Sequence, residues 1–106
     1  ENKKAEIARV SGASLDRLVA VARACADLTI EIQGHTDARG RRSANLALSR
    51  ERADTVKNYL VERGLSADRL VAVGFGPDRP VASNSTESGR AKNRRIEFRV
   101  LRGETH

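Results

Sequence analysis

A chain of 106 residues can bury one hydrophobic core but not two, so a single domain over residues 1–106 is expected. The net charge of +6, from 20 Lys and Arg against 14 Asp and Glu, favours an anionic partner such as nucleic acid, an anionic membrane surface or an acidic polymer. One cysteine excludes an intrachain disulfide, and no apolar run reaches the ~20 residues that span a bilayer. Contact with a membrane is therefore expected only through parts of a parent protein outside this sequence.

The first predicted elements are a helix and a strand. Apolar residues recur at spacings of three and four over residues 14–26, which is typical of one buried helix face. Cys25 lies on that face and is expected to be buried, whereas a reactive thiol would need partial exposure. Residues 28–34 then alternate between apolar and polar side chains, as in a half-buried strand, until Gly34 ends the pattern. The apolar positions are Leu15, Leu18, Ala22 and Cys25 in the helix and Leu28, Ile30 and Ile32 in the strand.

A second helix and a second strand follow. After a polar loop at residues 38–43, apolar side chains again mark one helix face until Gly64, a residue type common just beyond a helix end. The run at residues 70–73 is short, apolar and partly β-branched, which indicates a buried strand closed by a turn at residues 74–77. The inward positions of this helix are Leu46, Ala53, Val56 and Leu60.

The rest of the chain predicts a long loop and a last strand. Residues 78–93 are mostly polar and predict mainly a loop, after which Ile96, Phe98 and Val100 alternate with polar residues. The order helix, strand, helix, strand, loop, strand indicates an α/β fold with helices packed on one sheet. Residues 1–10 follow neither period, so the first strand is expected to be truncated or to precede this sequence, which would leave an open sheet edge.

Four sequence blocks in a fixed order carry a resemblance over nearly the whole chain. The blocks are GHTDARG at residues 34–40, N-x-x-LS-x-x-RA at residues 45–53, GFG at residues 74–76 and N-x-T-x-x-GR-x-x-NRRIEF at residues 84–98. With these blocks the chain resembles the OmpA-like (OmpA/MotB C-terminal) peptidoglycan-binding domain family. One block alone would be weak, but four in the right order argue against chance.

The resemblance implies an α/β (α+β) fold, a βαβαββ sandwich with helices packed on one mixed sheet. It also implies that the ligand is the meso-diaminopimelate residue of the peptidoglycan stem peptide, with Asp37 and Arg52 as the two principal contacts. The family's opening strand normally carries an apolar-x-Phe pattern, which residues 1–10 lack. The other ligand-binding positions expected are Thr36, Asn45, Gly34, Ala38, Leu48 and Arg94.

The chemistry of Asp37 and Arg52 suits the same ligand. A diaminopimelate side chain ends in an ammonium and a carboxylate on one carbon, so a binder needs an anion and a cation that face one cleft. Arginine can donate two parallel hydrogen bonds to a carboxylate while staying charged, so lysine would not replace it conservatively. Asn45 lies seven residues before Arg52, about two helical turns and ~10 Å along one face. Unpaired N–H groups of the loop and of the helix's first turn would add donors.

Other functions are open to these charged residues. Asp37 and Arg52 alone could form an exposed salt bridge worth ~0.2 to 1 kcal/mol, which is compatible with a ligand site. His35 and Asp37 could chelate a metal, but a stable site usually takes three or four protein ligands, and no third stands at a convincing spacing. A basic cluster could bind phosphate, although three aromatic residues are too few for a base-stacking platform. The basic cluster is Arg90, Lys92, Arg94 and Arg95.

The sequence therefore predicts a noncovalent peptidoglycan-binding module that anchors an envelope protein to the cell wall. The expected location is the periplasm of a Gram-negative-type bacterium, in association with the outer membrane or the cell envelope. The alternative is a nucleic-acid-binding domain recruited by the basic cluster. No paired carboxylates, metal cluster or activated nucleophile is apparent, so neither enzyme activity nor a cofactor or metal is expected.

Overall fold

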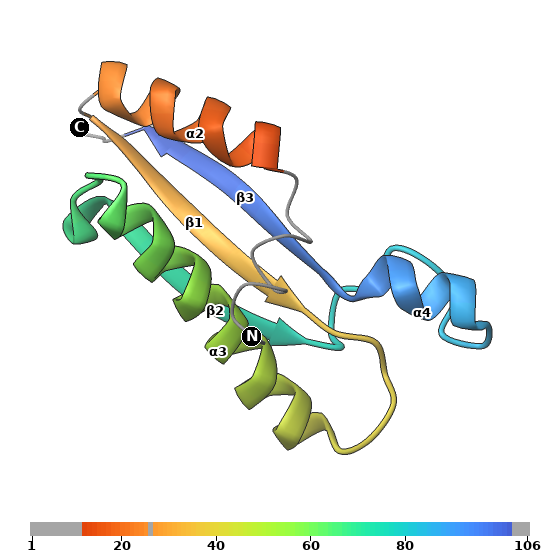
Figure 1. Ribbon diagram of the computed structural model, residues 1–106. Coiled ribbons are helices and arrows are strands. Elements are labelled where there is room, and N and C mark those ends of the chain that lie inside the picture. Colours follow the sequence, from red (N-terminus) through yellow and green to blue (C-terminus); the bar gives the residue numbers. More distant parts are fainter. Residues whose placement is uncertain (1–11, 26, 103–106) are drawn as a thin grey trace.

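The computed structural model describes residues 12–25 and 27–102 (Figure 1). Its helices and strands alternate along the chain, and the predicted helices and strands are found within a few residues of their expected ends. The elements are α2 (Gly12–Ala24), β1 (Leu28–His35), α3 (Arg42–Glu62), the 3₁₀ helix η1 (Ala67–Arg69), β2 (Leu70–Gly76), α4 (Glu87–Asn93) and β3 (Arg95–Arg102).

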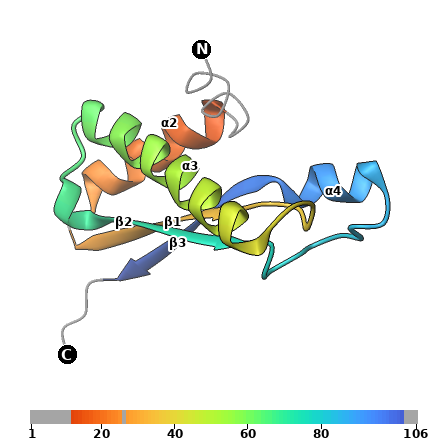
Figure 2. The same cartoon turned by 90° about the horizontal axis from the view of Figure 1, so that it is seen from below.

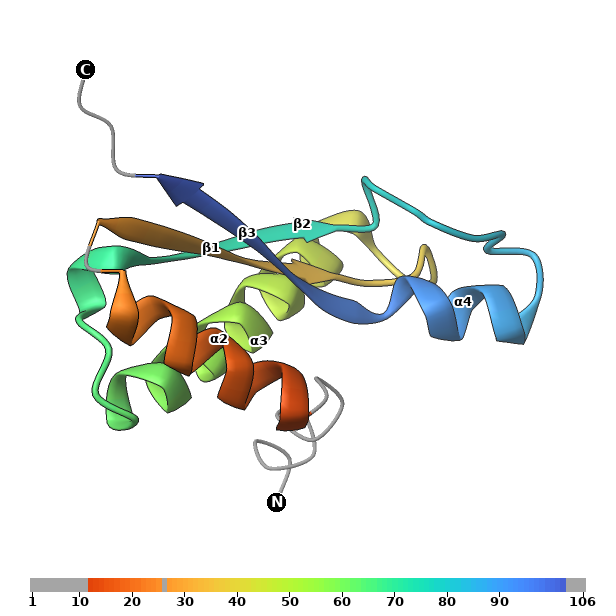
Figure 3. The same cartoon turned by 90° about the horizontal axis from the view of Figure 1, so that it is seen from above.

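The strands form one mixed sheet in the order β2-β1-β3. The central strand β1 runs parallel to β2 and antiparallel to β3, so that Ile32 lies between Ala72 and Phe98. Helices α2 and α3 lie on the same face of this sheet, while the opposite face carries no helix in the described part of the chain (Figures 2 and 3). The prediction of helices packed on one mixed sheet is therefore confirmed.

The hydrophobic core fills the space between the sheet and these two helices. Ile30 and Ile32 of β1 are at most 1% exposed, and Val56 and Leu60 of α3 are fully buried. Each such side chain contributes about 1.5 to 3 kcal/mol on burial. Leu15 and the other buried apolar residues of α2 and α3 occupy the faces that the helical spacing predicted. The others include Ala22 and Ala53, and Leu18 is half-buried against this core. Leu46 of α3 is also half-buried.

The segment predicted as a loop, residues 78–93, contains α4, so that prediction was wrong for residues 87–93. The helix has no apolar period because it is short and polar, and its start is fixed by capping instead. The hydroxyl of Thr86 accepts a hydrogen bond from the N–H of Gly89 at 3.0 Å, which satisfies one of the unpaired donors of the first turn. In Figure 1, α4 lies beyond the end of the sheet where β1 and β2 finish.

Other expectations differ in detail from the structure. Cys25 is half-buried, because it follows the end of α2 and is not on the core face of the helix. Strand β2 continues to Gly76, since Gly74 stays paired with β1. Val100 is 48% exposed, because β3 is an outer strand of the described sheet. The expectation about the first strand falls on residues 1–10, which lie outside the described residues. Within the described part, no helix combines the length and apolarity needed to cross a bilayer.

Helix α3 approaches the sheet closely because glycines face it. A Cβ on Gly34 of β1 would lie 2.0 Å from the backbone oxygen of Ser49, and a Cβ on Gly74 of β2 would lie 2.5 Å from the backbone nitrogen of Arg50. Ser49 is fully buried, and its hydroxyl accepts a hydrogen bond from the N–H of Gly76 at 2.9 Å. These contacts fix α3 over the ends of β1 and β2, where the loop after β1 leaves the sheet.

Arg69 ties the end of α2 to the sheet. Its Nε donates to the backbone oxygen of Leu28 at 2.8 Å, and its Nη2 donates to those of Ala22 at 2.6 Å and Cys25 at 2.5 Å. The last carbonyls of a helix have no hydrogen-bond partner within the helix, and they carry the negative end of its dipole. A cation at this end donates hydrogen bonds to the carbonyls and also interacts favourably with the dipole.

Replacing Arg69 with glutamine is expected to lower the free energy of unfolding by about 1 to 3 kcal/mol, because several acceptors lose a charged donor. Urea denaturation followed by circular dichroism would measure the loss. Arg17→Gln, at an exposed position of α2, is the matched control and is expected to stay within ~0.5 kcal/mol of the wild type. Equal losses in the two variants would contradict the capping role.

Candidate functional site

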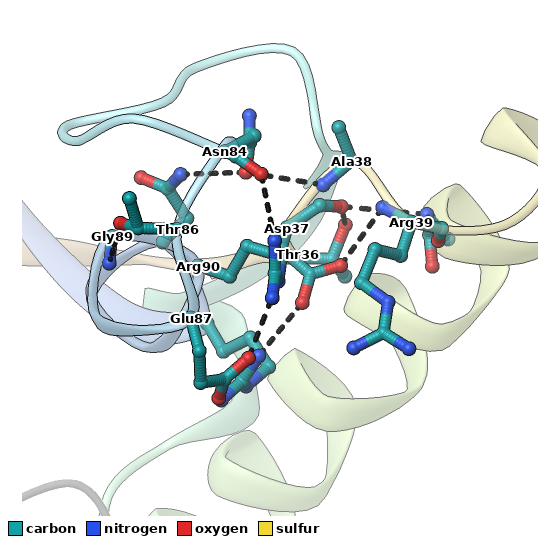
Figure 4. A network of polar contacts seen from close by, with 12 residues as sticks. Thr36, Asp37, Ala38, Arg39, Asn84, Thr86, Glu87, Gly89 and Arg90 are labelled. Carbon is teal, nitrogen blue, oxygen red and sulfur yellow. Dashed lines mark hydrogen bonds and ion pairs between the residues drawn. The ribbon is translucent and has the colours of Figure 1, made fainter.

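The loop after β1 holds Asp37 in one orientation at the end of the sheet. Asp37 is 8% exposed, and its Oδ1 accepts a hydrogen bond from the N–H of Arg39 at 3.0 Å. Thr36 is 4% exposed, and its hydroxyl donates to the backbone oxygen of Asp37 at 2.8 Å. Figure 4 shows these contacts within one network around Asp37. The carboxylate is therefore fixed by its own loop.

The other carboxylate oxygen is paired with an arginine from the far end of the chain. Nη1 of Arg94 donates to Oδ2 of Asp37 at 2.8 Å, and Nη2 of Arg94 donates to Oε2 of Glu87 at 2.7 Å. One guanidinium thus bridges two carboxylates, and the side chains of Asp37 and Glu87 are 11% and 60% exposed. The ion pair that the structure shows for Asp37 is thus with Arg94, while its predicted partnership with Arg52 stays a prediction.

Asn45 joins α3 to the same loop. Its Nδ2 donates to the backbone oxygen of Arg39 at 2.7 Å and, more weakly, to that of Asp37 at 3.4 Å. Helix α3 begins one turn earlier, after Arg41, and no side chain caps that end. The first N–H groups of a helix have no partner within it, so this end can supply donors next to Asp37.

Asn84 and Asn93 join the same loop to α4 and to the segment before it. The Oδ1 of Asn84 accepts from the N–H of Ala38 at 3.3 Å and from Nδ2 of Asn93 at 2.8 Å. Asn93 is fully buried, and its Oδ1 also accepts from the N–H groups of Val81 at 2.8 Å and Ala82 at 3.0 Å. The backbone around Asp37 is thereby held by side chains far away in sequence.

The remaining predicted site residues lie on or under α3. Gly34 is buried against Ser49, so it allows the close approach of α3. Leu48 is 37% exposed, and Arg52 is half-buried seven residues after Asn45. The structure therefore brings together Thr36, Asp37, Ala38, Asn45 and Arg94, and it places Leu48 and Arg52 further along α3.

His35 ends strand β1, and its contacts are with residues of the sheet. It is 1% exposed, its Nε2 lies 3.2 Å from Oε1 of Gln33, and its ring stacks on Phe75 with the centroids 5.4 Å apart. Burial and the charge of Arg95 lower the pKa of His35. Among the described residues, no group of three or more His, Cys, Asp and Glu side chains is placed to hold a metal ion.

The carboxyl of Asp37 is more acidic than usual despite its burial. Burial alone would raise its pKa, but the hydrogen bond from Arg39 and the hydrogen bond and charge of Arg94 together outweigh it and lower the pKa below the ordinary 3.8. The pKa of Glu87 is lowered mainly by its hydrogen bond from Arg94. At neutral pH both carboxyls are therefore ionised.

Acid is expected to remove the stabilisation that Asp37 provides. Because its pKa is lower in the folded than in the unfolded chain, this stabilisation is present above pH 3.8 and is lost as the pH falls through the folded pKa. Asp37→Asn should cost about 1 to 3 kcal/mol at pH 7 and much less once the pH has fallen below the folded pKa of Asp37. Urea denaturation of both proteins across this range would test it. A difference that does not change with pH would contradict the assignment.

Sequence reasoning missed Glu87 and the bracing role of Asn84. Glu87 lay in a segment predicted as loop, and the side-chain contacts of Asn84 join it to Ala38 and Asn93. The block N-x-T-x-x-GR-x-x-NRR contains Asn84 and could have indicated a structured segment, whereas Glu87 stands at one of its unspecified positions and has no such signal.

Known proteins resemble this chain in sequence. It is 45% identical over 86 residues to the peptidoglycan-binding protein ArfA of Mycobacterium tuberculosis, an alignment that covers 81% of this chain and 26% of that protein. It is 44% identical over 70 residues to the peptidoglycan-associated lipoprotein of Pseudomonas aeruginosa, which covers 66% of this chain and 42% of that protein. The chain thus spans less than half the length of these curated relatives.

Solved structures share its fold. The peptidoglycan-associated lipoprotein of Burkholderia pseudomallei superposes with a TM-score of 0.80 at 34% identity, over 84% of this chain and 75% of that one. The C-terminal domain of Helicobacter pylori MotB superposes with a TM-score of 0.75 over 83% of this chain and 69% of that one, and at 24% identity it shows the fold alone. Residues 1–94 match the OmpA family, and the chain belongs to that family.

Proposed function

We propose that this domain binds peptidoglycan noncovalently through the meso-diaminopimelate residue of the stem peptide and so anchors an envelope protein to the cell wall. The observation that carries the proposal is Asp37, a nearly buried carboxylate held by its own loop and paired with an arginine at the end of the sheet. Relatives named for binding to peptidoglycan or for association with it are 45% and 44% identical to this chain over the aligned residues. A buried, ionised carboxylate beside cations suits a zwitterionic head group.

In this proposal the ammonium of diaminopimelate binds Asp37, and its carboxylate binds the arginines and the uncapped end of α3. Arg52 is the principal cation, since its fork can donate two parallel bonds to the carboxylate, and Arg94 is already at the site. Asn45, Thr36 and Ala38 hold the loop, and Leu48 supplies apolar contact beside it. The N–H group of Ala38 donates to Asn84, and that of Arg39 donates to Asp37. These two loop donors are therefore used within the protein and not for the ligand.

The proposed activity is binding without catalysis. Both ligand charges are matched by fixed protein charges, and no step of bond cleavage is required for anchoring. Many tethered copies of the ligand in the wall raise the effective concentration, so retention can exceed what a single site provides. The net charge of +6 favours approach to an anionic polymer, an effect that salt screens.

The nucleic-acid alternative is weakened by the partners of the basic cluster. Arg90 donates to the side chain of Glu87 and the backbone oxygen of Asn84, and Arg94 donates to two carboxylates. Arg95 bonds to Glu97 and to two backbone oxygens. Three of the four cations of the basic cluster are therefore engaged by the protein's own acceptors. The similarity to known proteins reported above gives a nucleic-acid-binding function no support.

The proposed setting is the periplasm of a Gram-negative-type bacterium. One relative, 52% identical over 71 residues, is named outer membrane porin F. We infer that the parent protein provides any attachment to a membrane, as the domain itself requires only the wall as its partner.

Cosedimentation with insoluble diaminopimelate-type peptidoglycan tests the proposal. The wild type should sediment with the wall, soluble stem-peptide fragments should release it, and single-stranded DNA at equal charge should not. Arg52→Ala should be retained less than the wild type. Release by DNA alone would favour the nucleic-acid function, and soluble wall fragments appearing during incubation would indicate a hydrolase.

A further inference from the structure

We propose that Glu87 is a positioning residue of this site, and that it holds Arg94 while the ammonium of the ligand occupies Asp37. The inference rests on the proposed function and concerns a residue that neither the motif chemistry nor the family assignment placed in the site. It begins with the two hydrogen bonds of the Arg94 guanidinium, one to Asp37 and one to Glu87.

Arg94 and the ligand need the same carboxylate. The Oδ1 of Asp37 is used by the N–H of Arg39, and Oδ2 is used by Nη1 of Arg94 at 2.8 Å. The side chain of Asp37 is 11% exposed, so little of it remains open to a new cation. An ammonium that binds Asp37 must therefore share Oδ2 with Arg94 or displace it, and two cations on one oxygen repel each other.

Glu87 offers Arg94 a second partner that the ligand does not need. Nη2 of Arg94 donates to Oε2 of Glu87 at 2.7 Å, through a different nitrogen from the one that binds Asp37. The side chain of Arg94 is 29% exposed, and a partly buried guanidinium that lost its only anion would be costly. With Glu87 in place, Arg94 can give up Asp37 and remain paired.

Glu87 is itself held in position by α4. Its Oε1 accepts from Nε of Arg90 at 3.2 Å, and Arg90 is bonded through Nη1 to the backbone oxygen of Asn84 at 3.0 Å. Successive ion pairs join Arg90 to Glu87, Glu87 to Arg94 and Arg94 to Asp37, so the four side chains form a line of alternating charges that ends at the site. A ligand with an ammonium and a carboxylate would extend this alternation, because its ammonium would lie next to the carboxylate of Asp37 at the end of the line.

The test is a double-mutant cycle on ligand affinity. Wild type, Glu87→Gln, Arg94→Gln and the double variant are titrated by calorimetry with a soluble disaccharide tripeptide that ends in meso-diaminopimelate. Glu87→Gln alone should bind about threefold more weakly, the effect of a pair whose carboxylate is more than half exposed. In the Arg94→Gln background the same change should have no effect, because Glu87 acts only through Arg94.

The control is Glu62→Gln, which makes the same charge change at the far end of α3 and should bind as the wild type does. A loss from Glu87→Gln that persists in the Arg94→Gln background would overturn the inference, since it would show a separate effect on α4. So would an affinity of Glu87→Gln equal to that of Glu62→Gln. If the wild type does not bind the fragment at all, the proposed function fails as well, so the two failures are distinguishable.

Discussion

Replacing Asp37 with asparagine is expected to abolish specific retention on the wall. The change keeps the shape of the side chain but removes the anion that faces the ligand ammonium, and it leaves Arg94 next to that ammonium without a charge between them. Loss of one member of a buried, hydrogen-bonded charge pair costs about 2 to 5 kcal/mol, which is roughly 30-fold or more in affinity. Calorimetry with the soluble stem-peptide fragment and cosedimentation with insoluble wall would both measure it.

Asp54→Asn is the matched control for this experiment. It removes one negative charge from α3 and breaks an exposed pair with Arg50, an ion pair of 3.2 Å. We expect it to bind like the wild type, because Asp54 has no part in the network around Asp37. Thermal unfolding of both variants would show that each is folded at the assay temperature. Equal retention of the wild type and Asp37→Asn would exclude Asp37 as the ligand anion.

The second large effect is on stability, and it comes from Gly34. In Gly34→Ala the new Cβ would lie 2.0 Å from the backbone oxygen of Ser49, and backbone cannot move aside as a flexible side chain can. The helix must therefore shift from the sheet or the strand must bend, at a cost of about 3 kcal/mol or more in the free energy of unfolding. Urea denaturation would measure the loss, and Asn45 should also move relative to Asp37.

Gly40→Ala separates crowding from backbone strain. Gly40 has a φ of +86°, a left-handed conformation, but nothing lies within 4 Å of the position of a Cβ there. Only the conformational penalty of about 1 to 2 kcal/mol is expected. If Gly40→Ala were as destabilising as Gly34→Ala, the close approach of α3 would not explain the effect at Gly34.

The parts of the fold that follow a hydrophobic period could be predicted from the sequence. Val56 and Leu60 are buried as their spacing indicated, and β1 has its apolar residues on the helix-covered face. Helix α4 could not be predicted in this way, because it has no apolar face and is specified by the cap at Thr86. Ser49 was missed for a similar reason: it is a fully buried polar residue whose place depends on Gly34 and Gly76.

The sequence predicted the residues of the candidate site better than the ion pairs between them. The motifs singled out Asp37 and Arg94, and the structure brings both into one network. The pairing of Asp37 with Arg94 depends on where α4 ends relative to the loop after β1, and one sequence does not give that position. The ligand contacts themselves, including those of Arg52, stay predictions. Likewise no sequence motif pointed to Arg69, whose donors reach carbonyls more than 40 residues away in sequence.

The separation of 57 residues between Asp37 and Arg94 has a consequence during synthesis. While the ribosome is still adding residues, the acidic loop emerges long before the arginine that pairs with it. A nascent chain that ended between these two residues would present the carboxylate of Asp37 without Arg94 and without the complete set of hydrogen bonds from Asn84 and Asn93. Under the proposed function, a domain could therefore attach to the wall only once it has been translated past α4, as far as Arg94.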